Sequence, residues 1–172
     1  MHRVLSRTVA VLVLAALAAA AGAVRADEAE PQGFRGLDWG VDAASVEGLT
    51  LIESGDSDFY VREGERLLVG QAELTDIIYG FFEGRFYTVV VEYEGFANFT
   101  MILYALEAKY GQATNSDAEN FRHYWFFETV DLYIEYSQEE GAGTVFYVYK
   151  PIMELREERL RGGQSGEVLD DI

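Results

Sequence analysis

The sequence contains no cysteine, and this absence excludes several classes of protein. A disulfide-stapled scaffold, an Fe–S cluster, a zinc ribbon and a cysteine nucleophile all require thiols. Lipid attachment to a mature N-terminal cysteine is excluded for the same reason. The chain must therefore fold by packing, and its composition of 49% hydrophobic and 14% aromatic residues is sufficient for a substantial core.

Histidine is also scarce, and the chain holds only two. One of them is His2, and the other, His123, lies in the pattern Phe121-x-His123-x-Trp125-x-Phe127. Strand alternation puts His123 on the same face as these aromatic side chains, which is typical of a structural histidine. One histidine alone does not form a typical transition-metal site, and the sequence has no Gly-x-Ser-x-Gly nucleophile elbow. We therefore predict neither triad nor zinc hydrolysis.

Basic residues are outnumbered, with 13 Lys and Arg against 30 Asp and Glu and a net charge of −17. Binding to nucleic acid and to anionic lipid depends on Lys and Arg contacts with phosphate, so we expect neither partner. The ordinary explanation of so acidic a surface is solubility. A basic partner or bound cations are the alternative.

Residues 1–26 have the layout of a secretory signal peptide. His2, Arg3 and Arg7 form a basic start, and an apolar run follows over 9–24. Val24-Arg25-Ala26 then places small residues at the −3 and −1 positions of a cleavage site. A retained membrane helix is the alternative, but such a helix needs about 20 apolar residues. We expect a periplasmic or secreted protein with no membrane anchor after cleavage.

The remaining chain alternates between helix and strand signals. A flexible lead-in over 27–33 is followed by a short helix over 42–47 with Asp42 as its cap. A second helix is expected over 99–110, capped by Asn98 and ended by Gly111. The predicted strands are 49–53, 59–62, 74–82, 86–94, 121–127, 132–136 and 144–149. A final helix is predicted over 151–161.

This order predicts one α+β domain over 34–161, a mostly antiparallel sheet with packed helices. It also suggests two weakly related helix-plus-hairpin halves. The strongest hairpin signal is Glu83-Gly84 between 74–82 and 86–94. Residues 162–172 have the composition of a disordered acidic tail.

The strand over 86–94 is predicted to be central, because its inner part is apolar on both faces. Strict alternation places Tyr87, Val89, Val91 and Tyr93 on one face of it, and Phe86, Thr88, Val90, Glu92 and Glu94 on the other.

Four short motifs resemble a group of small uncharacterised bacterial secreted proteins. They are Phe34-x-Gly36-Leu37-x-Trp39-Gly40, Gly84-x-Phe86, Lys109-Tyr110-Gly111 and Trp125. Gln112-Ala113 stands where members of that group often carry proline. The element order also resembles the small envelope domains of the SmpA/OmlA (BamE-like) and β-lactamase-inhibitor-like type. That resemblance implies protein binding and assigns no catalytic residue. This chain differs from the envelope lipoproteins in lacking their lipidated cysteine.

Two acidic loops are the candidates for a metal site, since calcium prefers oxygen ligands from flexible loops. One contains Glu53, Asp56 and Asp58, and the other contains Asn115, Asp117 and Glu119. Neither follows the twelve-residue calcium loop with its terminal bidentate Glu, so solvated turns are the favoured interpretation. We predict no metal and no cofactor.

The aromatic residues offer a second kind of candidate. Most must form the core, but an antiparallel sheet can expose one face, and tyrosine is favoured at protein interfaces. The candidates for an exposed aromatic surface are Tyr87, Tyr93, Tyr124, Tyr133 and Tyr147.

These observations favour an exported, non-catalytic protein-interaction module of the bacterial cell envelope, with another envelope protein as its partner. The alternative is a small-ligand or carbohydrate-binding protein that uses an aromatic-lined pocket or sheet face. A third class, a carboxylate enzyme, requires two acids that face each other across a cleft. The acid pairs that share a strand face are Glu92 with Glu94 and Asp131 with Glu135.

Overall fold

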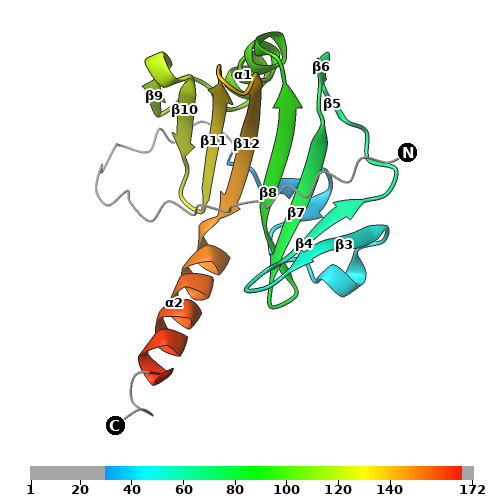
Figure 1. Cartoon of the computed structure of the whole chain (residues 1–172), viewed down its shortest axis with the longest axis vertical. Helices are drawn as coiled ribbons and strands as arrows, with labels where there is room; N and C mark the ends of the chain where they lie inside the picture. Colours follow the sequence, from blue (N-terminus) through cyan, green and yellow to red (C-terminus); the bar gives the residue numbers. More distant parts are fainter. Residues whose placement is uncertain (1–29, 168–172) are drawn as a thin grey trace.

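The computed structural model describes residues 30–167, with side chains from 30 to 162. Over these residues the chain forms an α+β domain in which two helices pack on an eight-stranded antiparallel sheet, accompanied by small hairpins (Figure 1). The predicted fold class is therefore confirmed. The predicted signal peptide over 1–26, the start of the lead-in and residues 168–172 lie outside the described residues.

The large sheet is built from two meanders that meet through their last strands. In spatial order its strands are β3 (Leu49–Ser54), β4 (Asp58–Arg62), β7 (Asp76–Phe82), β8 (Arg85–Glu94), β12 (Ala142–Tyr149), β11 (Val130–Ser137), β10 (Arg122–Phe126) and β9 (Asn115–Asp117).

A helical segment precedes each meander, as the expectation of two helix-plus-hairpin halves requires. The 3₁₀ segment η1 (Ala43–Ser45) precedes β3, and Asp42 caps it as predicted by accepting a hydrogen bond from the Ala44 N–H at 2.8 Å. The helix α1 (Phe96–Tyr110) precedes β9. The remaining short elements are the pair β1 (Gly33–Phe34) and β2 (Leu37–Asp38), the pair β5 (Leu68–Val69) and β6 (Ala72–Glu73), the segment η2 (Ala118–Asn120) and the helix α2 (Lys150–Glu167).

The hairpin of β7 and β8 turns at Glu83 and Gly84, as predicted. Both residues have positive φ, at 48° and 76°, which is the conformation of a type I′ turn. The backbone twist of this turn matches that of the flanking strands, so two residues suffice to reverse the chain.

A β-bulge in this hairpin overturns the predicted faces of β8. Gly80 pairs with Thr88, but the next residue, Phe81, pairs with Phe86, so Tyr87 is the extra residue. Phe86 consequently joins Val89 in the main core. Tyr87 packs on the opposite side of the sheet, against Phe82 and against Ile152 of α2. The prediction that Tyr87 shares a face with Val89 is wrong, because alternation by two fails across a bulge.

The main core lies between one face of the sheet and α1. The buried stripe of α1 is Phe99, Ile102, Leu106 and Tyr110. From the sheet, Trp125 of β10 enters this core with 1% of its surface exposed, and its Nε1–H donates to the Gly111 carbonyl at 2.9 Å. The segment before β3 extends the cover of this face, since Trp39 stacks on Phe86 with 4.8 Å between ring centroids.

The start of α1 differs from the prediction. The helix begins at Phe96, so Asn98 lies in its first turn instead of capping it. Asn98 is used in a tertiary contact, because its Oδ1 accepts a hydrogen bond from the Glu73 N–H of β6 at 3.1 Å. The predicted end at Gly111 is confirmed, with φ of 77° and an N–H that donates to the Glu107 carbonyl.

The two ends of the described chain are more ordered than the sequence indicates. Residues 30–33 were expected in a flexible lead-in, yet Glu30 Oε1 accepts hydrogen bonds from the Thr129 N–H and hydroxyl at 2.6 and 2.7 Å. Pro31 is buried, and its carbonyl accepts a bond from Trp39 Nε1 at 2.8 Å. At the other end, α2 continues to Glu167 through residues expected in the disordered tail, and it projects beyond the sheet (Figure 1).

A partly buried ionic contact attaches the loop before β5 to the core. Glu65 Oε1 lies 2.7 Å from Arg35 Nη1, and its Oε2 accepts a hydrogen bond from the Tyr79 hydroxyl at 2.6 Å. Burial works to raise the pKa of Glu65, but the hydrogen bonds and the Arg35 charge outweigh it and hold that pKa below its ordinary value. Burial and the Glu65 carboxylate together raise the pKa of Tyr79, so its hydroxyl remains a donor.

Candidate functional site

The sheet face opposite α1 carries a row of polar side chains along neighbouring strands. We call this surface the open face. The pairing register places one residue from each of six neighbouring strands side by side on it. These residues, the polar row, are Asp76, Glu92, Thr144, Glu135, Arg122 and Asp117.

An apolar set lies two residues further along the same strands. These residues, the aromatic row, are Ile78, Val90, Phe146, Tyr133 and Tyr124. The rings are in contact, since Tyr133 stacks on Phe146 with 4.5 Å between centroids and Tyr124 lies 6.1 Å from Tyr133. Phe126, the next residue on this face of β10, stacks on Tyr124 at 6.0 Å. Four of these side chains, Tyr124, Phe126, Tyr133 and Phe146, are half-buried and together form a continuous aromatic surface.

The helices leave this surface accessible among the described residues. α1 packs on the opposite face, and α2 packs with Ile152 against Phe82 and Tyr87, at the hairpin end of the open face. The aromatic row lies between that end and the polar row, so the polar row flanks it on one side and the Asp131–Lys150 pair flanks it at β11 on the other.

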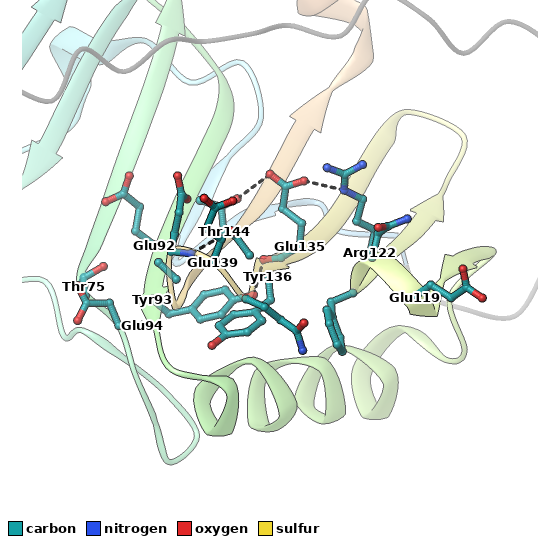
Figure 2. Close-up of a pocket in the computed structure, with 17 residues that line it drawn as sticks. Thr75, Glu92, Tyr93, Glu94, Glu119, Arg122, Glu135, Tyr136, Glu139 and Thr144 are labelled. Atoms are coloured by element: carbon teal, nitrogen blue, oxygen red, sulfur yellow. Dashed lines mark hydrogen bonds and ion pairs between the residues drawn. The ribbon is translucent and has the colours of Figure 1, made fainter.

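The polar row borders a hollow of about 450 Å³. The hollow lies beside the turn between β11 and β12, which contributes Glu139 and Glu140, and Glu92, Glu94 and Glu135 line its sheet side. Figure 2 shows the polar-row side chains of Glu92, Thr144, Glu135 and Arg122, with the rings of Tyr93 and Tyr136 nearer α1. The lining combines these carboxylates with the rings of Tyr93, Phe121 and Tyr136.

Two basic residues interrupt the negative charge of the open face, and both are paired. Arg122 Nε lies 3.3 Å from Glu135 Oε2, and Lys150 Nζ lies 3.5 Å from Asp131 Oδ1. Burial raises the pKa of Asp131, although the charge and hydrogen bond of Lys150 act in the opposite direction. The polar row nevertheless holds four carboxylates against the guanidinium of Arg122, and the hollow adds Glu94, Glu139 and Glu140, so this side of the open face carries a net negative charge.

The structure separates the five candidate tyrosines into three environments. Tyr124 and Tyr133 meet on the open face. Tyr93 and Tyr147 are buried in the main core, at 1% and 7% exposed, and Tyr87 is buried against α2 at 3%. Only the first pair is available to a partner.

Sequence reasoning missed Phe126 and Phe146 as surface residues. Alternation on β12 makes both of its faces apolar, with Val145 and Tyr147 on one and Phe146 and Val148 on the other. A signal was present only in the neighbouring strand, where Asp131 and Glu135 flank Tyr133 and mark its face as the more polar one.

The two acidic loops do not assemble as metal sites. Asp56 lies 3.9 Å from Arg156 Nη2, and Asp58 accepts a hydrogen bond from the Ser54 hydroxyl at 2.6 Å. Asp117 caps η2 through bonds from Asn120, which contribute to holding its pKa below the ordinary value. Asn115 pairs with Tyr124, while Glu53 lies on β3 and Glu119 on η2. No group of three or more His, Cys, Asp or Glu side chains in the described part of the chain could hold a metal ion.

His123 lies on the α1 side of β10, as predicted from its alternation with Trp125. It is half-buried, its Nδ1 is 3.0 Å from the Ser116 hydroxyl, and its ring is 6.1 Å from that of Phe99. Burial lowers the pKa of His123, and the charge of Glu107 only partly opposes this effect.

We expect this histidine to make folding stability depend on pH. Because its folded pKa lies below its ordinary value of 6.5, the unfolded chain binds the proton first. The contribution is therefore complete above that value and is lost as the pH falls through it. Melting curves between about pH 8 and 5.5 should show a steeper fall in Tm for the wild type than for His123→Gln. Equal slopes for the two proteins would contradict the prediction.

Comparisons with protein-family models, with curated proteins and with solved structures find no match for this chain. No helix within residues 30–167 is long and apolar enough to cross a membrane.

Proposed function

We propose that this protein is an exported, non-catalytic protein-interaction module of the bacterial cell envelope, and that its partner docks on the open face. The observation that carries the proposal is the set of contacting half-buried rings of Tyr124, Phe126, Tyr133 and Phe146 on a sheet face that α1 leaves uncovered. Aromatic residues are enriched at the centres of protein interfaces, where they bury large areas at a low cost in conformational entropy.

The shape of the surface favours a protein over a small molecule. Small-ligand sites are typically concave and mostly apolar. Here the aromatic side chains lie across adjacent strands, and the nearby hollow of about 450 Å³ is lined mostly by polar side chains, among them several glutamates. An extended contact surface with an acidic border is typical of a docking face.

Two sequence features support the remaining parts of the proposal. The signal-peptide layout over 1–26 supports export. The likeness to SmpA/OmlA-like and β-lactamase-inhibitor-like envelope domains supports protein binding.

Site-specific photo-crosslinking in the native cells tests the proposal. A photoreactive phenylalanine analogue at Tyr124 or Phe146 should give a discrete adduct with one other protein. The matched control is the same analogue at Tyr104, which lies on the outer side of α1 with 72% of its surface exposed. It should give no such adduct, because it is accessible without belonging to the open face.

The outcome separates the two classes of function. Equal adducts from Tyr104 and Tyr124 would show that the contact is unspecific and would overturn the proposal. The absence of any protein adduct would also overturn it, and would leave binding of a carbohydrate to the stacked rings of Tyr133 and Phe146 as the alternative. Glycan-array binding by wild type and by Phe146→Ala would then test that alternative.

A further inference from the structure

We infer that the segment which docks on the open face is an amphipathic helix with Lys or Arg along one flank. This inference rests on the proposed function and specifies the chemistry of the partner. Three independent features of the face lead to it, namely its saturated backbone, its dimensions and its charge.

The backbone of the open face has no hydrogen bonds to offer a partner. β8, β12 and β11 are paired on both sides within the sheet, so their N–H and C=O groups bond to neighbouring strands. An extended peptide laid on this face would leave its own backbone groups without partners in the contact. A helix satisfies its backbone internally and needs only side-chain contacts, as in helix-in-groove recognition.

The dimensions of the aromatic row suit a short helix. Ile78, at the β7 end of the row, is buried at 7% exposed, so the accessible part runs from Val90 of β8 across β12 and β11 to Tyr124 of β10. With about 4.8 Å between strands, this path is about 14 Å long. A helix rises about 1.5 Å per residue, so about 10 residues, or about three turns, cover it. Apolar residues at i, i+3, i+4 and i+7 would form the stripe that lies on the rings.

The charge of the open face determines which residues of the docking helix lie beside its apolar stripe. The polar row lies two residues from the aromatic row along each strand, a distance of about 7 Å. A Lys or Arg beside the apolar stripe can bridge this distance, since its aliphatic stem packs on apolar surface while its charged end reaches outward. Asp76, Glu92 and Glu135 lie on that side of the row. Although Arg122 is paired with Glu135, the polar row holds four carboxylates against this one guanidinium and is net negative. The complementary partner is therefore basic.

A second copy of this chain fits the same face less well. Its net charge of −17 opposes close approach. Its projecting helix α2 carries arginines, but Arg156 lies 3.9 Å from Asp56 and Arg159 lies 3.4 Å from Glu83 of its own body. The partner is accordingly a different protein.

Two designed peptides test the inference with purified full-length protein. Both have about 14 residues and the same leucine stripe, with lysine at the polar positions of one and glutamate at those of the other. We expect the lysine peptide to bind at least about tenfold more tightly than the glutamate peptide in low salt, with its affinity reduced by salt. Phe146→Ala should weaken its binding by about tenfold.

A charge-matched pair of variants distinguishes the face from the general acidity of the protein. Glu92→Gln/Glu135→Gln alters the polar row, and Glu154→Gln/Glu158→Gln makes the same change in charge on α2. The first should weaken binding of the lysine peptide by about fivefold or more, and the second by less than about twofold. Equal effects of the two variants, or equal binding of the two peptides, would overturn the inference.

Its failure can be told apart from failure of the proposed function. A protein adduct at Tyr124 whose crosslinked segment is acidic or non-helical retains the docking function and overturns the inference. An adduct between two copies of this chain, supported by a dimer in sedimentation that is lost in Phe146→Ala, also overturns it. Absence of any protein adduct overturns the proposed function itself.

Discussion

Replacement of Trp125 by alanine should destabilise the protein by about 3–5 kcal/mol. The indole is 1% exposed and lies in the core between β10 and α1. Its removal leaves a cavity beneath α1, and it also removes the hydrogen bond that the Gly111 carbonyl accepts at the end of that helix. Urea unfolding monitored by circular dichroism should show a large decrease in the midpoint concentration.

Phe126→Ala is the matched control for this prediction. Phe126 follows Trp125 in the same strand, so its side chain projects to the open face, where it is half-buried. Because less of its surface leaves water on folding, we expect a loss of about 1–2 kcal/mol. A loss of unfolding free energy as large as that of Trp125→Ala would mean that the open face is part of the core. It would contradict both the half-buried position of Phe126 and the proposed docking surface.

The second large effect is expected from Gly143→Ala in β12. A Cβ at this position would overlap the Glu135 carbonyl and the Tyr93 hydroxyl. That hydroxyl donates to the same carbonyl at 2.6 Å, and burial raises the pKa of Tyr93 so that it stays protonated. The methyl group must displace the buried Tyr93 ring or separate β11 from β12. We expect a loss of about 3 kcal/mol, measured by the same unfolding experiment.

Gly55→Ala provides the control for the change from glycine to alanine. No heavy atom lies within 4 Å of a Cβ built at Gly55, which is exposed between β3 and β4. The change should alter stability by no more than about 0.5 kcal/mol. If Gly143→Ala were equally mild, the close contact between Gly143 and Tyr93 would be wrong.

Much of the fold could be predicted because its signals are local. The turn at Glu83-Gly84 requires two residues of positive φ, the cap at Asp42 requires one side-chain oxygen, and the end of α1 requires a glycine at 111. Each of these depends on residues adjacent in sequence. The strands of the large sheet are recognisable for the same reason, except for β9, whose pairing with β10 gives its polar residues their strand conformation.

The candidate site was less predictable because a site on a sheet depends on register. Tyr124 and Tyr133 were among the predicted aromatic residues, but so were Tyr93 and Tyr147, which have the same residue type and the same kind of strand. Nothing in a strand with two apolar faces shows which face α1 will cover. The bulge at Tyr87 added a second error, since one extra residue reverses the side chains that follow it.

The sequence by itself determined the class of the fold, the exclusion of thiol chemistry and the acidic character of the protein, because composition and local patterns carry these properties. Only the tertiary structure decided that Tyr124, Tyr133 and Phe146 form one surface and that Glu92 and Glu135 lie in the same row beside it. The physical reason is that these residues come from separate strands. The pairing of β10, β11 and β12 brings the three rings together, and the pairing of β8 with β12, which joins the two meanders into one sheet, places Glu92 in the row beside them.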